Sequence, residues 1–109
     1  MASSPSLVEA FIASYGEAGL TTLKVLIAAI KDRNERFGKS SHCITYEYVR
    51  KWITFRKLNV KFTTIERAMR KLAEGGVLKR KKVGRKDVIF CLNEEHPMVW
   101  YLMNSVKVG

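Results

Sequence analysis

Residues 62–80, with the sequence FTTIERAMRKLAEGGVLKR, contain the clearest structural pattern of the chain. Its apolar residues Ile65, Met69 and Leu72 recur at the spacing of one helix face. Thr63-Thr64-Ile65-Glu66 fits a capping box, in which a Thr hydroxyl and a Glu carboxylate accept from free N–H groups of the first turn. Two consecutive glycines then interrupt the pattern. The stretch therefore predicts an amphipathic helix over residues 63–75.

The face opposite the apolar stripe carries hydroxyl and basic side chains. A helix held by one stripe and basic on the other can enter the major groove of DNA, with its positive N-terminal end beside a phosphate. We therefore expect DNA contacts from Thr63, Thr64, Arg67, Arg70 and Lys71. Glu66, placed in the cap, and Glu74 oppose this charge. The sequence leaves open whether Arg67 and Arg70 contact bases or phosphates, or form ion pairs with these glutamates.

A basic β-hairpin is predicted directly after the glycines. The apolar period changes to two over residues 77–83 and 88–92, with a turn at residues 84–87 between them. Most of the hairpin cations should contact phosphates, which gives affinity without sequence readout. The tip can reach a minor groove. The expected contacts are Lys79, Arg80, Lys81, Lys82, Arg85 and Lys86.

Upstream of this stretch the sequence predicts three helices. A capping box at Ser6–Glu9 opens a helix over residues 6–18, which Gly19 stops. Thr21 or Thr22 caps a second helix that ends at Gly38. Its apolar stripe is Leu23, Leu26, Ile27, Ile30 and Phe37. Thr45 caps a third helix with Val49, Trp52, Ile53 and Phe55 pointing inward, before a break over residues 58–61 at which Asn59 accommodates the left-handed conformation.

At the other end of the chain, Pro97 opens a closing helix over residues 97–106. Both terminal helices are apolar, so they either close the core or form a dimer interface, and we expect a homodimer. At 109 residues the chain has the length of a single domain. We expect one domain over residues 1–109, with a core at 21–92 and terminal helices at 6–18 and 97–106.

The two cysteines and two histidines are candidates for a redox or metal site. Residues 42–44 predict a short strand that pairs with the last hairpin strand and brings Cys43 near Cys91. Two buried thiols and a disulfide are both compatible with that pairing. Two cysteines form no disulfide framework, which is typical of a reducing, intracellular protein. His42, Cys43, Cys91 and His96 lack the spacing of a zinc site, so no metal and no cofactor are expected.

The positive charge of the chain is concentrated in its middle. The chain has 20 Lys and Arg against 10 Asp and Glu, a formal net charge of +10. Residues 38–92 hold fifteen of the basic and four of the acidic residues, a net charge of +11. A charge confined to one segment indicates a binding surface for a polyanion rather than general solubility.

The segment Phe62–Arg80 resembles the recognition helix and first wing strand of the winged helix-turn-helix superfamily. Members commonly have a Thr-capped helix and then a glycine followed by two apolar residues and a Lys or Arg, as in Gly76-Val77-Leu78-Lys79. The resemblance extends over roughly residues 21–92 and is closest in organisation to small prokaryotic regulators of the multiple-antibiotic-resistance-regulator type (MarR/ArsR-like). It implies a mainly α fold with a small antiparallel β-sheet, a winged helix-turn-helix with extra N- and C-terminal helices.

These observations predict a sequence-specific double-stranded DNA-binding protein, a transcriptional regulator with helix 63–75 in the major groove and the wing 77–92 on backbone and minor groove. The alternatives are an architectural nucleoid protein and an RNA- or ribosome-associated or protein-interaction module. No catalytic arrangement of residues is present, so an enzyme is not expected. No apolar run approaches the roughly 20 residues of a membrane span and no basic leader opens the chain, so we expect a cytoplasmic, nucleoid-associated protein.

Overall fold

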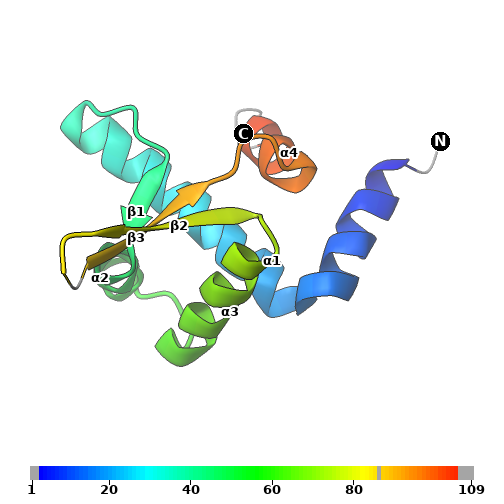
Figure 1. Cartoon of the computed structure of the whole chain (residues 1–109), viewed down its shortest axis with the longest axis horizontal. Coiled ribbons are helices and arrows are strands. Elements are labelled where there is room, and N and C mark those ends of the chain that lie inside the picture. The colour runs from blue at the N-terminus through cyan, green and yellow to red at the C-terminus, as the bar shows by residue number, and fades with distance from the viewer. Residues whose placement is uncertain (1–2, 86, 106–109) are drawn as a thin grey trace.

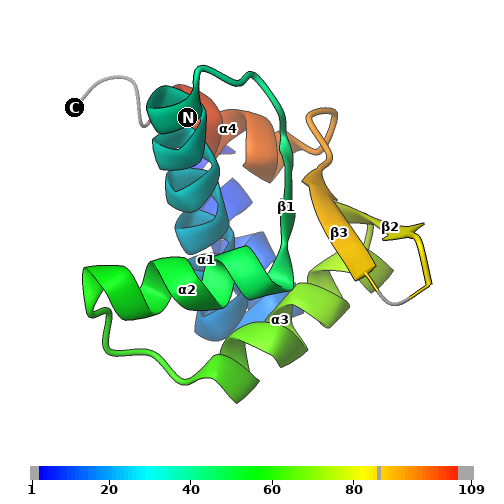
Figure 2. The same ribbon diagram turned by 90° about the vertical axis from the view of Figure 1, so that its left-hand side faces the viewer.

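The structure is a computed structural model that describes residues 3–85 and 87–105. In this part of the chain the elements follow in the order α1 (Ser3–Phe37), β1 (Cys43–Thr45), α2 (Tyr46–Arg56), α3 (Phe62–Glu74), β2 (Leu78–Val83), β3 (Asp87–Leu92) and α4 (Pro97–Ser105). The predicted class, mainly α with a small antiparallel β-sheet, is confirmed. Figures 1 and 2 show the sheet beside the helices, with the β2–β3 hairpin projecting away from them.

The sheet has the strand order β1-β3-β2, and both pairings are antiparallel. The predicted hairpin is confirmed, with Leu78 opposite Leu92 and Val83 opposite Asp87. The predicted pairing of the short first strand with the last hairpin strand is confirmed too, although β1 covers residues 43–45 rather than 42–44. The long-range β1–β3 pairing thus attaches the hairpin to the start of α2.

The first two predicted helices form one kinked helix, so the predicted break at Gly19 is wrong. The kink lies at Gly16, which has φ 75° and ψ 173°, a left-handed conformation that glycine adopts without steric cost. Gly19 lies inside the helix and is buried. A β-carbon at this position would lie only 2.6 Å from Cβ of Tyr15. Its role is close packing rather than helix termination.

The caps predicted for these two helices are wrong as well. The helix begins at Ser3, three residues before the predicted capping box at Ser6. Thr21 and Thr22 lie within the helix, and Thr22 is fully buried, so neither caps a helix N-terminus. Figure 1 shows the two segments of α1 meeting at an angle, with the N-terminal segment in dark blue.

The predicted N-terminal cap of α2 is confirmed, whereas the residue predicted to end the helix is wrong. The Thr45 hydroxyl accepts a hydrogen bond from the backbone N–H of Tyr48 at 3.1 Å, which confirms the predicted N-cap. At the other end, Lys57 rather than Asn59 has the left-handed conformation, with φ 56°. The N–H of Lys57 donates to the carbonyl of Thr54 at 3.1 Å, which closes the last turn.

One core joins α2, α3, the sheet, α4 and both segments of α1, the N-terminal segment through Phe11. The predicted inward residues of α1 and α2 are buried, with two exceptions, Phe37 and Phe55, which are 62% and 64% exposed. The indole N–H of Trp52 donates to the carboxylate of Asp32 at 3.1 Å, which satisfies the polar atom of this buried side chain. In Figure 2, α2 crosses in front of α1, and α3 lies below the two. The closing helix is confirmed over Pro97–Ser105, and residue 106 lies outside the described residues.

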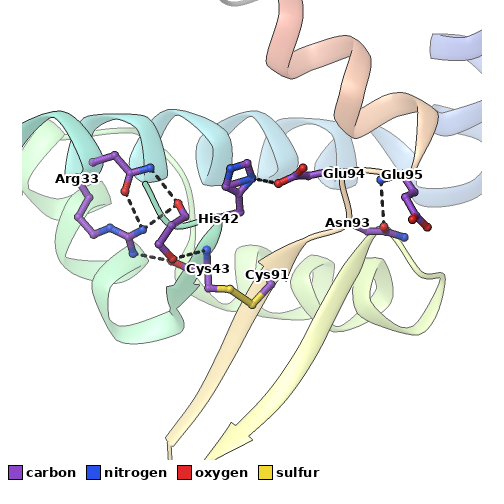
Figure 3. A network of polar contacts seen from close by, with 9 residues as sticks. Arg33, His42, Cys43, Cys91, Asn93, Glu94 and Glu95 are labelled. Carbon is purple, nitrogen blue, oxygen red and sulfur yellow. Dashed lines mark hydrogen bonds and ion pairs between the residues drawn. A yellow bond between two sulfur atoms is a disulfide. The ribbon is translucent and has the colours of Figure 1, made fainter. Parts of the chain in front are cut away.

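A disulfide joins Cys43 on β1 to Cys91 on β3, which are direct partners in the sheet. Of the two alternatives for these cysteines, the structure therefore has the disulfide and not free thiols. Figure 3 shows polar contacts on either side of it: the guanidinium of Arg33 donates to the carbonyl of Cys43 at 2.6 Å, and His42 forms an ion pair with Glu94. Among the described residues, no helix is long and apolar enough to cross a membrane.

Candidate nucleic-acid interface

Helix α3 separates its buried and exposed side chains as predicted. Ile65, Ala68, Met69 and Leu72 are buried in the core. The five predicted contact residues on this helix, Thr63, Thr64, Arg67, Arg70 and Lys71, are all exposed. The helix is thus held by one face and presents its hydroxyl and basic side chains to solvent.

The N-terminus of α3 differs from the predicted capping box. The helix begins at Phe62, with Lys61 in the capping position and no side-chain cap hydrogen bond there. Because the helix already begins at Phe62, Thr63 lies in its first turn and Glu66 lies beyond that turn, so the predicted reciprocal bonds are not formed. The N–H groups of a first turn have no partner within their own helix. This end of α3 therefore presents polar donors and the positive end of the helix dipole next to exposed Thr63 and Thr64.

Glu66 forms an ion pair with Arg70 one turn along α3. The Arg70 Nη2 atom lies 3.2 Å from Oε2 of Glu66, and both side chains are largely exposed. Of the roles left open for Arg70, local ion pairing is the one that this structure contains. An exposed pair at this spacing contributes only about 0.3–0.5 kcal/mol, so a phosphate or a base edge can displace the carboxylate.

The hairpin presents its cations on both of its faces. Along β2 only Leu78 is buried, while Lys79, Arg80, Lys81 and Lys82 are exposed. Since side chains alternate along a strand, Arg80 and Lys82 point to the opposite face from Lys79 and Lys81. Gly84, with φ 74°, forms the turn, and Arg85 beside it is exposed. Lys86, the remaining predicted contact, lies outside the described residues.

Helix α3 and the hairpin border one groove of about 440 Å³. Arg70 from α3 and Arg80 from β2 both line it, although they are ten residues apart in the chain. The start of α2 supplies the third wall, with Tyr46 and Glu47. The groove therefore brings together one cation from each of the two predicted contact elements, beside the carboxylates of Glu47 and Glu66.

Tyr46 and Glu47 were not among the predicted contact residues. The signal that locates them is the Thr45 cap, which places the next two residues in the first turn of α2, against α3. The hydroxyl of Tyr46 donates to the carbonyl of Phe62 at 3.3 Å. Burial raises the pKa of Tyr46, and the Glu66 carboxylate raises it further, while Arg50 acts in the opposite direction. Tyr46 thus stays a neutral hydrogen-bond donor that ties α2 to the first residue of α3.

No metal centre is found in the described part of the chain, where no three His, Cys, Asp or Glu side chains lie together. The two cysteines are bonded to each other, which removes them as thiolate ligands. His96 instead accepts a hydrogen bond at Nδ1 from the N–H of Met98, at 3.1 Å. Burial lowers the pKa of His96, which favours this neutral, accepting form.

No protein-family model and no curated protein sequence matches this chain.

Proposed function

We propose that the protein is a winged helix-turn-helix that binds double-stranded DNA sequence-specifically and regulates transcription. The observation that supports this most is the groove shared by Arg70 of α3 and Arg80 of β2. Exposed cations on two elements, one on either side of a groove, suit DNA, in which a sugar-phosphate backbone lies beside a major groove. In this arrangement α3 enters the major groove and the β2–β3 hairpin follows the adjacent backbone and minor groove.

The side chains divide between two kinds of contact. The cations of the hairpin are exposed on both faces of a two-stranded ribbon, which suits phosphates better than base edges. Arg67, Arg70 and Lys71 lie on the solvent face of a helix, where side chains reach base edges. Thr63 and Thr64 stand beside the N-terminal N–H groups of α3, where a phosphate oxygen is favoured.

A homodimer is part of this proposal. An apolar groove of about 440 Å³ runs between the N-terminal segment of α1, its second half and α4, lined by Val8, Leu20 and Leu102 among others. Trp100 on α4 is 61% exposed. A second copy seated on this apolar surface would cover it and place two α3 helices on half-sites about 34–36 Å apart. Sedimentation at micromolar concentration should give twice the 12.5 kDa monomer mass; a monomer there would contradict this part.

Selection of bound duplexes from a random pool tests the function. A regulator should enrich one motif, and a palindromic one if it acts as a dimer. Tight binding without enrichment would instead indicate an architectural protein. Failure to bind any duplex at about 150 mM salt would contradict the proposal as a whole, because phosphate contacts dominate affinity for DNA.

A further inference from the structure

A second cationic surface lies on the helices, away from the proposed duplex interface. We call it the aromatic face; it consists of Phe37 at the end of α1, Tyr48 and Phe55 on α2, and the cations around them, Arg36, Lys39 and Lys51. Phe37 and Phe55 are 62% and 64% exposed. Both occupy positions at which the apolar pattern predicts inward residues. Contiguous exposed apolar surface is a mark of interaction sites.

The three aromatic residues form one continuous surface. Tyr48 borders a cavity of about 450 Å³ together with Phe37 and Lys39. Tyr48 also borders a cavity of about 130 Å³ together with Phe55 and Lys51. It therefore lies between the two exposed rings. A further hollow of about 530 Å³ continues past Phe55 towards Phe62 on α3.

Guanidinium groups already stack on the rings of this region. The Cζ atom of Arg36 lies 5.2 Å from the ring centroid of Phe55, and that of Arg56 lies 5.3 Å from the ring of Trp52. These distances are those of cation–π contacts. Such a ring has a cation on one face and solvent on the other. A flat ligand group can stack on the solvent face and lie near the positive charge.

Asp32, which borders the cavity between Tyr48 and Phe55, is already engaged, whereas Glu47 is exposed in the hollow past Phe55. The carboxylate of Asp32 accepts from the indole of Trp52 at 3.1 Å and pairs with Arg36 at 3.4 Å. Lys39 and Lys51 are both exposed, and they border the cavities beside Phe37 and beside Phe55, respectively. An incoming ligand thus meets exposed rings and exposed ammonium groups, which complements a ligand with flat faces and repeated negative charge.

We propose that the aromatic face binds single-stranded nucleic acid, with bases stacked on Phe37 and Phe55 and phosphates near Lys39 and Lys51. Proteins that bind single strands combine cations that follow the backbone with aromatic rings that stack on the bases. An acidic peptide would match the charge, but it would leave the two exposed rings without flat partners. Duplex DNA has its bases paired and stacked inside, so it does not reach these rings.

The rings of this site lie on other elements than the proposed duplex contacts, although the hollow past Phe55 reaches Phe62, the first residue of α3. Figure 2 shows α2 and the upper part of α1 on the left, and the β2–β3 hairpin on the right. The duplex contacts assigned above come from α3 and the hairpin, whereas Phe37, Tyr48 and Phe55 come from α1 and α2. Substitutions on the aromatic face therefore leave the proposed duplex contacts in place.

The test is titration of a labelled oligothymidine of about 20 nucleotides and of an abasic oligomer with the same number of phosphates. The wild-type protein should bind oligothymidine at least about tenfold more tightly than the abasic oligomer, since stacking accounts for roughly five- to hundredfold per base. Phe37→Leu/Phe55→Leu keeps apolar bulk without the rings and should abolish most of this preference. Both positions are exposed, so the variant should fold, and circular dichroism verifies this.

Phe37→Tyr/Phe55→Tyr supplies the matched control, because it keeps a ring at both exposed positions. It should keep the preference for oligothymidine. The proposal is overturned if the wild-type protein binds both oligomers equally, if the Leu variant retains the preference, or if the Tyr variant loses it to the same extent. It is likewise overturned if polyglutamate displaces oligothymidine as well as unlabelled oligothymidine does, since the site would then recognise charge without bases. Duplex affinity, measured alongside, should be unchanged in the Phe37/Phe55 variant.

Discussion

The α3–hairpin surface and the aromatic face are both cationic, but their positive charges have different neighbours. On the hairpin, Lys79 to Lys82 are exposed along a strand with one buried residue. On the aromatic face, guanidinium groups lie over rings, as Arg36 does over Phe55. The first arrangement suits a regular array of phosphates, and the second suits flat groups that carry charge. Net charge alone does not separate these functions, whereas the groups beside each cation do.

The largest effect is expected on the hairpin. Replacing Lys81, Lys82, Arg85 and Lys86 with Ala should weaken duplex binding by about 10²–10³-fold near 150 mM salt, because phosphate contacts are lost. Each lost contact should also reduce the slope of log affinity against log salt concentration by about 0.9. Fluorescence anisotropy at several salt concentrations measures both quantities. An unchanged slope would show that these cations do not contact phosphates, whatever the change in affinity.

The disulfide is expected to have the next largest effect, because it joins the two regions. Cys43 leads into α2, Cys91 lies in the hairpin strand β3, and the two are 48 residues apart. Closing a loop of that length in the unfolded chain stabilises the fold by about 4 kcal/mol in the chain-entropy model. Cys43→Ser/Cys91→Ser should therefore lower the free energy of unfolding by about 2–4 kcal/mol.

Thermal denaturation checks this expectation. It compares the double variant with the wild-type protein, the latter with and without a dithiol reductant. The reduced wild-type protein should melt close to the variant. Equal melting temperatures for oxidised and reduced protein would contradict a stabilising role for the bond.

A smaller effect is expected at Asp32, beneath the aromatic face. Asp32→Leu leaves the buried indole N–H of Trp52 without its acceptor and should destabilise the fold by about 1–3 kcal/mol. Asp32→Asn keeps an acceptor oxygen and should cost less. Urea denaturation of both variants compares them, and equal midpoints would mean that the carboxylate–indole bond contributes little.

The smallest effect is expected on substitution of Glu66, and it is a gain of duplex affinity rather than a loss. Glu66→Gln removes a negative charge from the duplex-facing groove and releases Arg70, so duplex affinity should rise about two- to fivefold. Glu35→Gln makes the same change of charge on α1, at an exposed position. An equal rise in that control would attribute the gain to net charge rather than to Arg70.

The elements with a clear period were predictable from the sequence. The stripe of Ile65, Met69 and Leu72 located α3, and the change to period two after Gly76 located the hairpin. The pairing of β1 with β3 followed from two short apolar strands, and the proximity of Cys43 to Cys91 followed from that pairing. In each case the information is local, or follows from one antiparallel pairing.

The remaining features, the kink of α1 and the exposed aromatic residues, depended on contacts between distant segments. Gly16 and Gly19 are equally able to break a helix, and the sequence does not distinguish them; in the structure Gly19 is buried, with Leu72 of α3 nearby. The apolar stripe predicted Phe37 and Phe55 inward, but each lies near the end of its helix and is exposed. For the same reason the aromatic face was not visible in the sequence, since its members come together from α1 and α2 only in the folded chain.

The most direct test of the difference between the two surfaces is to titrate two variants with the same set of ligands. The hairpin variant, with Ala at positions 81, 82, 85 and 86, should lose duplex affinity yet keep its preference for oligothymidine over the abasic oligomer. Phe37→Leu/Phe55→Leu should lose that preference and keep its duplex affinity. Loss of both properties in either variant would contradict two separate sites and show that one cationic surface binds every nucleic acid.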